Sequence, residues 1–196
     1  MIKVMETDYS ANEMYKHVCD YILENITTRN LIEIAKECVF AGINSDNLFI
    51  LAALSEKFDA WDTILKYYKS TLEDLNINEP SKKEAIEYLS IYYCKKLIDK
   101  KISPKKFLEK MKYQIYNKGV FEYDKKTLGD SIGIEDIMGL YYSIDDLRGI
   151  KLYDPDEYSN KNYEPEKLKL YNECYHEAEK YLKKKNYGMM HGKYYT

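Results

Sequence analysis

The chain has 196 residues, of which 45% are hydrophobic and 32% are charged, and its net charge is −3. This length and apolar content suit a globular protein with its own hydrophobic core, and they exclude a disordered chain. Because the two signs of charge are interspersed and nearly balanced, the overall charge favours neither a nucleic acid nor a membrane surface as a partner.

The four cysteines, Cys19, Cys38, Cys94 and Cys174, are far apart in the sequence and form no C-x-x-C motif. Each lies within an apolar helical pattern, which is typical of buried free thiols. The N-terminal MIKVMETDYS has no apolar signal core, and no run approaches the roughly 18 apolar residues that span a membrane. We therefore expect a cytoplasmic protein that does not contact a membrane.

Helix signals dominate the chain. Two capping boxes, Ser10 with Glu13 and Ser81 with Glu84, predict helix starts. Apolar residues recur at helical spacing after each predicted start, and no sustained alternation typical of strands occurs. The predicted helices cover residues 10–26, 29–41, 46–56, 59–75, 81–100, 104–116 and 165–185.

Residues 120–164 form a less regular, acidic segment that four glycines punctuate. Within it, IEDIMGLYYSIDDL predicts one or two short helices, and YDPDEYSNKNYEP predicts an irregular loop. Residues 187–196 read as a mobile tail. The predicted fold class is all-α, a single domain over residues 1–196 built as a bundle or array of about seven to eight helices.

Eight lysines fall within the 19 residues from Cys94 to Lys112. Phe107, Met111 and Ile115 form an apolar stripe at spacing four, which turns most of the lysines towards solvent. Acidic blocks flank the lysines on both sides, and the run contains no arginine to clamp a phosphate. We interpret it as a solvated face; the alternative is an anion-facing surface for nucleic acid, built from Lys95, Lys96, Lys105, Lys106 and Lys112.

The sequence contains no recognisable catalytic, cofactor-binding or metal-binding motif. Its three histidines form no H-x-x-x-H or Cys/His spacing, and no glycine-rich phosphate loop or G-x-S-x-G occurs. We therefore predict no metal site and no cofactor, and we favour a non-catalytic protein. The alternative is an enzyme whose site forms only in three dimensions, around His17 or His176 with carboxylates.

The acidic loop near residue 155 is the predicted contact with a protein partner. Asp154 and Asp156 imitate the first ligands of a calcium loop, but Ser159 and Pro165 stand where such a loop needs glycine and glutamate. Tyrosine beside carboxylates suits a basic protein partner instead. The predicted partner-binding residues are Tyr153, Asp154, Asp156, Glu157 and Tyr158.

Residues 51–147 resemble a family of small bacterial helical proteins of unassigned function. The resemblance rests on the turn Leu72–Ile77, with Asn76 where glycine is common, and on the turn Lys101–Pro104, with Lys100 in the place of a glycine. It implies a helical fold and carries no catalytic residue to this chain. The acidic, tyrosine-rich loop, the small cytosolic format and the absence of catalytic signatures lead us to predict a bacterial protein-binding module, immunity-like or antitoxin-like.

Overall fold

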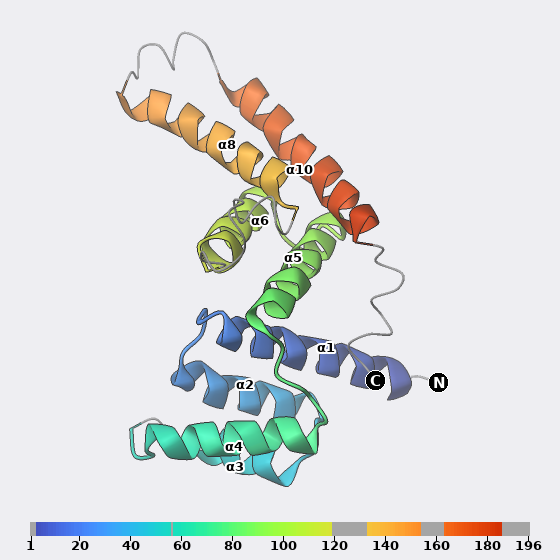
Figure 1. Ribbon diagram of the computed structural model, residues 1–196, viewed down its shortest axis with the longest axis vertical. Helices are drawn as coiled ribbons and strands as arrows, with labels where there is room; N and C mark the ends of the chain where they lie inside the picture. Colours follow the sequence, from blue (N-terminus) through green and yellow to red (C-terminus); the bar gives the residue numbers. More distant parts are fainter. Residues whose placement is uncertain (1–2, 56, 119–132, 154–162, 186–196) are drawn as a thin grey trace. The chain divides into compact units, whose positions relative to one another are not determined.

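The computed structural model describes residues 3–55, 57–118, 133–153 and 163–185. Over these ranges the protein is all-helical, with eight α-helices, one π-helical segment and no strand (Figure 1). The predicted fold class is therefore confirmed. Within the same ranges, none of the helices combines the length and apolar character that crossing a membrane requires.

The chain divides into two compact units, residues 1–89 and residues 90–196. We call them unit 1 and unit 2. Helix α5 (Lys82–Ile98) contributes its first half to unit 1 and its second half to unit 2. The expectation of a single domain over the whole chain stays a prediction.

Unit 1 is built from α1 (Lys3–Ile22), α2 (Thr28–Phe40), α3 (Asp46–Ala53), α4 (Trp61–Asp74) and the start of α5. Helices α1, α2 and α4 follow one another as neighbours, and α3 packs against both α2 and α4 (Figure 1). One residue from each of these helices shows the shared core, since Val18, Leu31, Leu48 and Ile64 are all buried. Aromatic pairs add to this core, and the rings of Tyr21 and Tyr68 lie 5.0 Å apart.

Several helices begin where the sequence predicts. The Ser81 hydroxyl accepts from Glu84 N at 3.3 Å, and Glu84 Oε2 accepts from Ser81 N at 2.8 Å, which completes the capping box. Ser103 caps α6 (Pro104–Lys110) by accepting from Lys106 N at 3.3 Å. The prediction for the first helix is wrong, because α1 already begins at Lys3 and Ser10 lies inside it.

Four helices end in the same motif, in which one residue adopts a positive φ. These residues are Glu24, Gly42, Asn76 and Lys100, with φ of 55°, 86°, 53° and 56°. At the end of α5, Lys100 N donates to the carbonyl of Leu97 at 2.9 Å and Lys101 N to that of Lys96 at 2.8 Å. This bonding pair satisfies carbonyls that the helix end leaves open. Asn76 and Lys100 are the two positions at which the resemblance places glycine.

Unit 2 contains the end of α5, α6, a π-helical segment η1 (Met111–Tyr116), α8 (Glu135–Tyr153) and α10 (Glu164–Lys184). Helices α8 and α10 lie side by side, and α6 packs against both (Figure 1). The predicted apolar stripe is confirmed, since Phe107, Met111 and Ile115 are fully buried.

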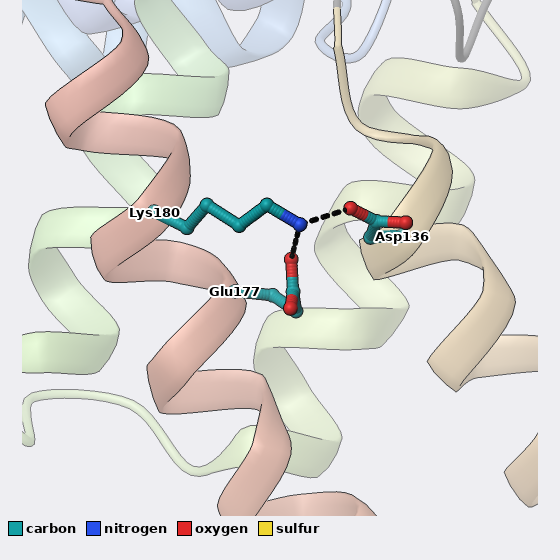
Figure 2. Close-up of polar contacts among 3 residues, drawn as sticks. All are labelled: Asp136, Glu177 and Lys180. Carbon is teal, nitrogen blue, oxygen red and sulfur yellow. Dashed lines mark hydrogen bonds and ion pairs between the residues drawn. The ribbon is translucent and has the colours of Figure 1, made fainter.

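An exposed ion-pair cluster joins α8 to α10 (Figure 2). Lys180 Nζ lies 2.6 Å from Asp136 Oδ2 and 3.2 Å from Glu177 Oε2. The hydrogen bond from Lys180 lowers the pKa of the Asp136 carboxyl, and the same bond raises the pKa of the Lys180 ammonium. The cluster pins the start of α8 against the end of α10.

Two large apolar side chains on the helices are exposed rather than buried. Leu168 is 61% exposed on α10, whose buried face is Cys174, Ala178 and Tyr181. Trp61, the first residue of α4, is 58% exposed, whereas Ile64 behind it is buried. Both lie near the starts of their helices, Trp61 as the first residue of α4 and Leu168 as the fifth of α10.

Candidate functional site

Unit 1 exposes a set of large apolar side chains around α3, which we call the aromatic surface: Phe49, Ile50, Phe58 and Trp61. Phe58 is 81% exposed and Trp61 58%, and Phe49 and Ile50 are also exposed on α3 itself. Six of the eight residues of helix α3 are apolar, yet the helix buries only Leu48 and Leu51. A short helix buries only the face that packs against its neighbours, so the apolar side chains on its other face, Phe49 and Ile50, stay exposed to solvent.

Local hydrogen bonds fix the geometry of the aromatic surface. The Ser45 hydroxyl accepts from Leu48 N at 3.2 Å and so caps α3. The Asp74 carboxylate at the end of α4 accepts from Ser45 Oγ at 2.5 Å and from Asn47 Nδ2 at 3.0 Å. These bonds, that from Ser45 foremost, lower the pKa of the Asp74 carboxyl. They hold the start of α3 against the end of α4.

The turn after α3 is equally tight and brings Phe58 and Trp61 close to the end of that helix. Asp59 Oδ2 accepts from Ser55 N at 2.7 Å, and Phe58 N donates to the carbonyl of Ser55 at 3.0 Å. Lys57 Nζ lies 5.3 Å from the centroid of the Phe58 ring. The surface is therefore presented by a helix and a closed turn, which limits the entropy lost on binding.

The charges around the aromatic surface are mainly negative. Residues 46–62 carry four carboxylates and one lysine, and residues 1–79 carry 14 acidic against 7 basic side chains. Asp46 and Asp62 lie in the first turns of α3 and α4 and are exposed. The surface thus combines apolar anchors with an acidic rim.

Unit 2 holds a group of four tyrosines around one lysine, which we call the tyrosine cluster: Lys112, Tyr113, Tyr116, Tyr141 and Tyr142. Lys112 Nζ lies 4.5 Å from the ring centroid of Tyr116, 5.8 Å from that of Tyr141 and 4.6 Å from that of Tyr142, and it donates a hydrogen bond to the Tyr142 hydroxyl. The hydroxyls of Tyr113 and Tyr141 are 2.9 Å apart. Tyr113 is 54% exposed and Tyr142 43%, whereas Tyr141 is buried beneath them.

The π-helical segment η1 positions the tyrosine cluster. Its last turn closes with Asn117 N donating to the carbonyl of Lys112 at 2.9 Å, five residues back. A π turn holds more residues than an α turn, so it keeps Met111 and Ile115 together on the buried side. Tyr113 is left exposed, and Lys112 lies beside the tyrosines of α8. π-helical segments are rare overall, and those that do occur are often found at functional sites.

The five candidate anion-facing lysines fall into three environments. Lys105 and Lys106 are exposed in the first turn of α6, as expected for a solvated face. Lys95 and Lys96 are half-buried at the end of α5, and burial lowers the pKa of the Lys95 ammonium. Lys112, expected on the solvated side, is half-buried within the tyrosine cluster.

The predicted partner-binding loop lies almost wholly outside the described residues. Tyr153 is the last residue of α8, and Asp154, Asp156, Glu157 and Tyr158 fall beyond it in a range that the structure does not describe. Their role in binding stays a prediction.

The described residues provide no obvious nucleophile. Burial raises the pKa of all four thiols, that of Cys38 to about 11 and that of Cys174 to about 12, so they stay protonated at neutral pH. Burial also lowers the pKa of His17, whose Nδ1 has no hydrogen-bond partner among the described residues. No group of three or more His, Cys, Asp or Glu side chains in the described part of the chain could hold a metal ion. The enzyme alternative stays a prediction.

Comparisons with known proteins do not identify a function, so the arrangement of the exposed residues described above is the guide to it. No protein-family model matches the chain. Searches of the curated proteins and of the solved structures likewise find no match.

Proposed function

We propose that the protein is a non-catalytic binding module that captures a protein partner through the aromatic surface of unit 1. The single observation that carries this proposal is the exposure of Phe49, Ile50, Phe58 and Trp61 around one short helix. Tryptophan is among the residues most enriched where binding energy concentrates, and Trp61 is the only tryptophan of the chain.

The partner is a basic segment with apolar anchors. Carboxylates outnumber lysines around the aromatic surface, so a partner carrying Lys or Arg beside its apolar residues is complementary in charge. An amphipathic helix of that composition fits, because its apolar face can lie on α3 while its basic residues meet Asp46 and Asp62. The proposed setting is the bacterial cytoplasm, and an immunity-like or antitoxin-like role is the form of binding that the sequence favours.

The test is capture of the partner by the tagged full chain and three variants. Trp61→Ala and Phe58→Ala each remove one anchor, and Phe40→Ala is the matched control. Phe40 is 91% exposed at the end of α2, near the start of α3, whereas Phe58 and Trp61 follow the end of α3. All three side chains are exposed, so the thermal unfolding of each variant should match that of the wild type.

We expect Trp61→Ala to weaken the complex by about 2 kcal/mol or more, which is roughly 30-fold in Kd, since central aromatic anchors contribute that much. Phe40→Ala should leave the Kd unchanged. A complex that survives high salt and is lost in Trp61→Ala supports the proposal. Equal binding by wild type and Trp61→Ala would refute it.

A further inference from the structure

The tyrosine cluster of unit 2 has hydrogen-bond donors that suit an anionic ligand. Lys112 carries three N–H donors, and the hydrogen bond to Tyr142 uses one of them. The Tyr142 hydroxyl accepts that bond and keeps its own proton for a further acceptor. A ligand placed here would therefore contribute acceptor oxygens, as a phosphate does.

The two exposed rings of the cluster can each take a flat partner. Tyr113 is 54% exposed and Tyr142 43%, and both are supported from behind by Tyr141, whose ring centroid lies 6.2 Å from that of Tyr113 and 5.5 Å from that of Tyr142. Rings that are held in place by neighbours and open on their outer side are suitable platforms for base stacking.

The charge of the chain segment that carries Lys112 and Tyr113 also favours a polyanion. Residues 90–118 contain nine lysines and only two carboxylates, a net charge of +7. The two arginines of the chain, Arg29 and Arg148, lie outside this block. Lysines neutralise phosphates as point charges without the forked geometry that reads guanine, so the expected binding is tolerant of sequence.

We propose that the tyrosine cluster binds single-stranded nucleic acid, with a phosphate at Lys112 and Tyr142 and one base stacked on each of Tyr113 and Tyr142. This is a second binding activity, separate from the capture of a protein by unit 1. The carboxylates of Asp145 and Asp146 are exposed on α8, one turn beyond Tyr141 and Tyr142, and they oppose a phosphate. Neutralising them should therefore strengthen binding.

The experiment measures the fluorescence anisotropy of a short labelled oligo-dT with the full chain over a series of salt concentrations. Tyr113→Leu and Tyr142→Leu remove the exposed rings, and Lys112→Met removes the charge. Lys105→Met is the matched control, because Lys105 belongs to the same basic block but is not in the tyrosine cluster. Asp145→Asn is the variant that should gain affinity.

We expect each Tyr→Leu variant to bind roughly 5- to 150-fold more weakly, which corresponds to stacking energies of about 1–3 kcal/mol per base. Lys112→Met should also lower the slope of log K against log salt by about 0.7, the value for one phosphate contact on a single strand. Asp145→Asn should tighten binding, and Lys105→Met should change it only slightly. Lys112→Met can rearrange the three rings that it touches, so the Tyr113→Leu variant, whose fold is checked by circular dichroism, decides independently.

Several results would overturn the proposal. The first is a wild type that does not bind the oligonucleotide at low salt. The second is a Lys105→Met variant that binds as weakly as Lys112→Met while the tyrosine variants bind normally, which would show that the lysines act only through their overall charge. Competition by poly-glutamate as effective as that by unlabelled oligo-dT would assign the cluster to an acidic protein instead. Competition by free thymidine monophosphate at the same concentration would assign it to a mononucleotide. Trp61→Ala should bind the oligonucleotide normally, which separates this test from that of unit 1.

Discussion

Replacing Lys100 by glycine should stabilise the protein, although glycine normally weakens a helical chain. Lys100 follows α5 with a φ of 56°, a conformation in which its Cβ crowds the backbone. That crowding costs roughly 1–2 kcal/mol, and glycine relieves it. Glycine also loses about 0.4–1 kcal/mol more backbone entropy on folding. The net expected gain is about 0.5–1 kcal/mol, which raises the Tm of a chain of this size by about 1–4 °C.

The matched control is Lys169→Gly. Lys169 is exposed like Lys100, but it lies inside α10, where its backbone is helical. Glycine there should cost about 1 kcal/mol relative to a good helix former and lower the Tm by a few degrees. Asn76→Gly provides a graded case: Asn76 has a φ of 53°, but asparagine tolerates this conformation better than lysine, so its gain should be smaller.

Urea unfolding followed by circular dichroism measures all three variants. The free energy of unfolding should be highest for Lys100→Gly, lower for Asn76→Gly and lowest for Lys169→Gly, with unchanged m-values. If Lys100→Gly loses stability as Lys169→Gly does, the left-handed turn after α5 does not exist in solution. The same result would remove the basis for the turn motif at Lys101–Pro104.

Three further predictions follow from other parts of the chain. Gly139→Ala should stabilise α8 by up to about 1 kcal/mol, because an added Cβ at this helical position meets no atom within 4 Å. Urea unfolding measures this gain, and a loss of stability would show that the space around Gly139 is filled. Asp136→Asn should lower the Tm at neutral pH. Lys180 depresses the pKa of the folded Asp136 carboxyl, so this ion pair stabilises the fold above the carboxyl's ordinary pKa, and the stabilisation disappears as the pH falls through the depressed value. The difference in Tm between wild type and Asp136→Asn should therefore vanish in acid. A difference in Tm that stays constant with pH would contradict this linkage. The four thiols should react with a thiol reagent at neutral pH only after unfolding in urea, and rapid labelling of the native protein would refute the burial of Cys19, Cys38, Cys94 and Cys174.

The helical fold could be predicted because its determinants are local. Caps such as Ser81 with Glu84, and apolar spacing such as Phe107 to Ile115, act within one or two turns of the chain. The candidate surfaces could not be predicted in the same way. Trp61 continues an apolar repeat in the sequence, yet in the structure it is exposed as the first residue of α4. One signal was present in the sequence: six consecutive apolar residues follow Asp46 and Asn47 in α3, and a helix of eight residues is too short to bury all of them.

Lys112 shows why local pattern and function diverge. An ideal α-helix turns by about 100° per residue, so apolar residues spaced four apart drift gradually around the helix axis. On such a helix, Lys112 lies off the apolar stripe, and the sequence alone therefore places it among the solvated lysines. The π turn at η1 opposes that drift, which keeps Met111 and Ile115 buried and sets Lys112 against tyrosines that lie some 30 residues further along the chain. A π turn is less stable than a continuous α-helix and is retained where packing or binding requires its geometry. Here packing accounts for the buried Met111 and Ile115, but it does not require Tyr113 to be open to solvent. That exposure, on a segment whose backbone departs from the common helix, is the reason for testing Tyr113 before any of the exposed lysines.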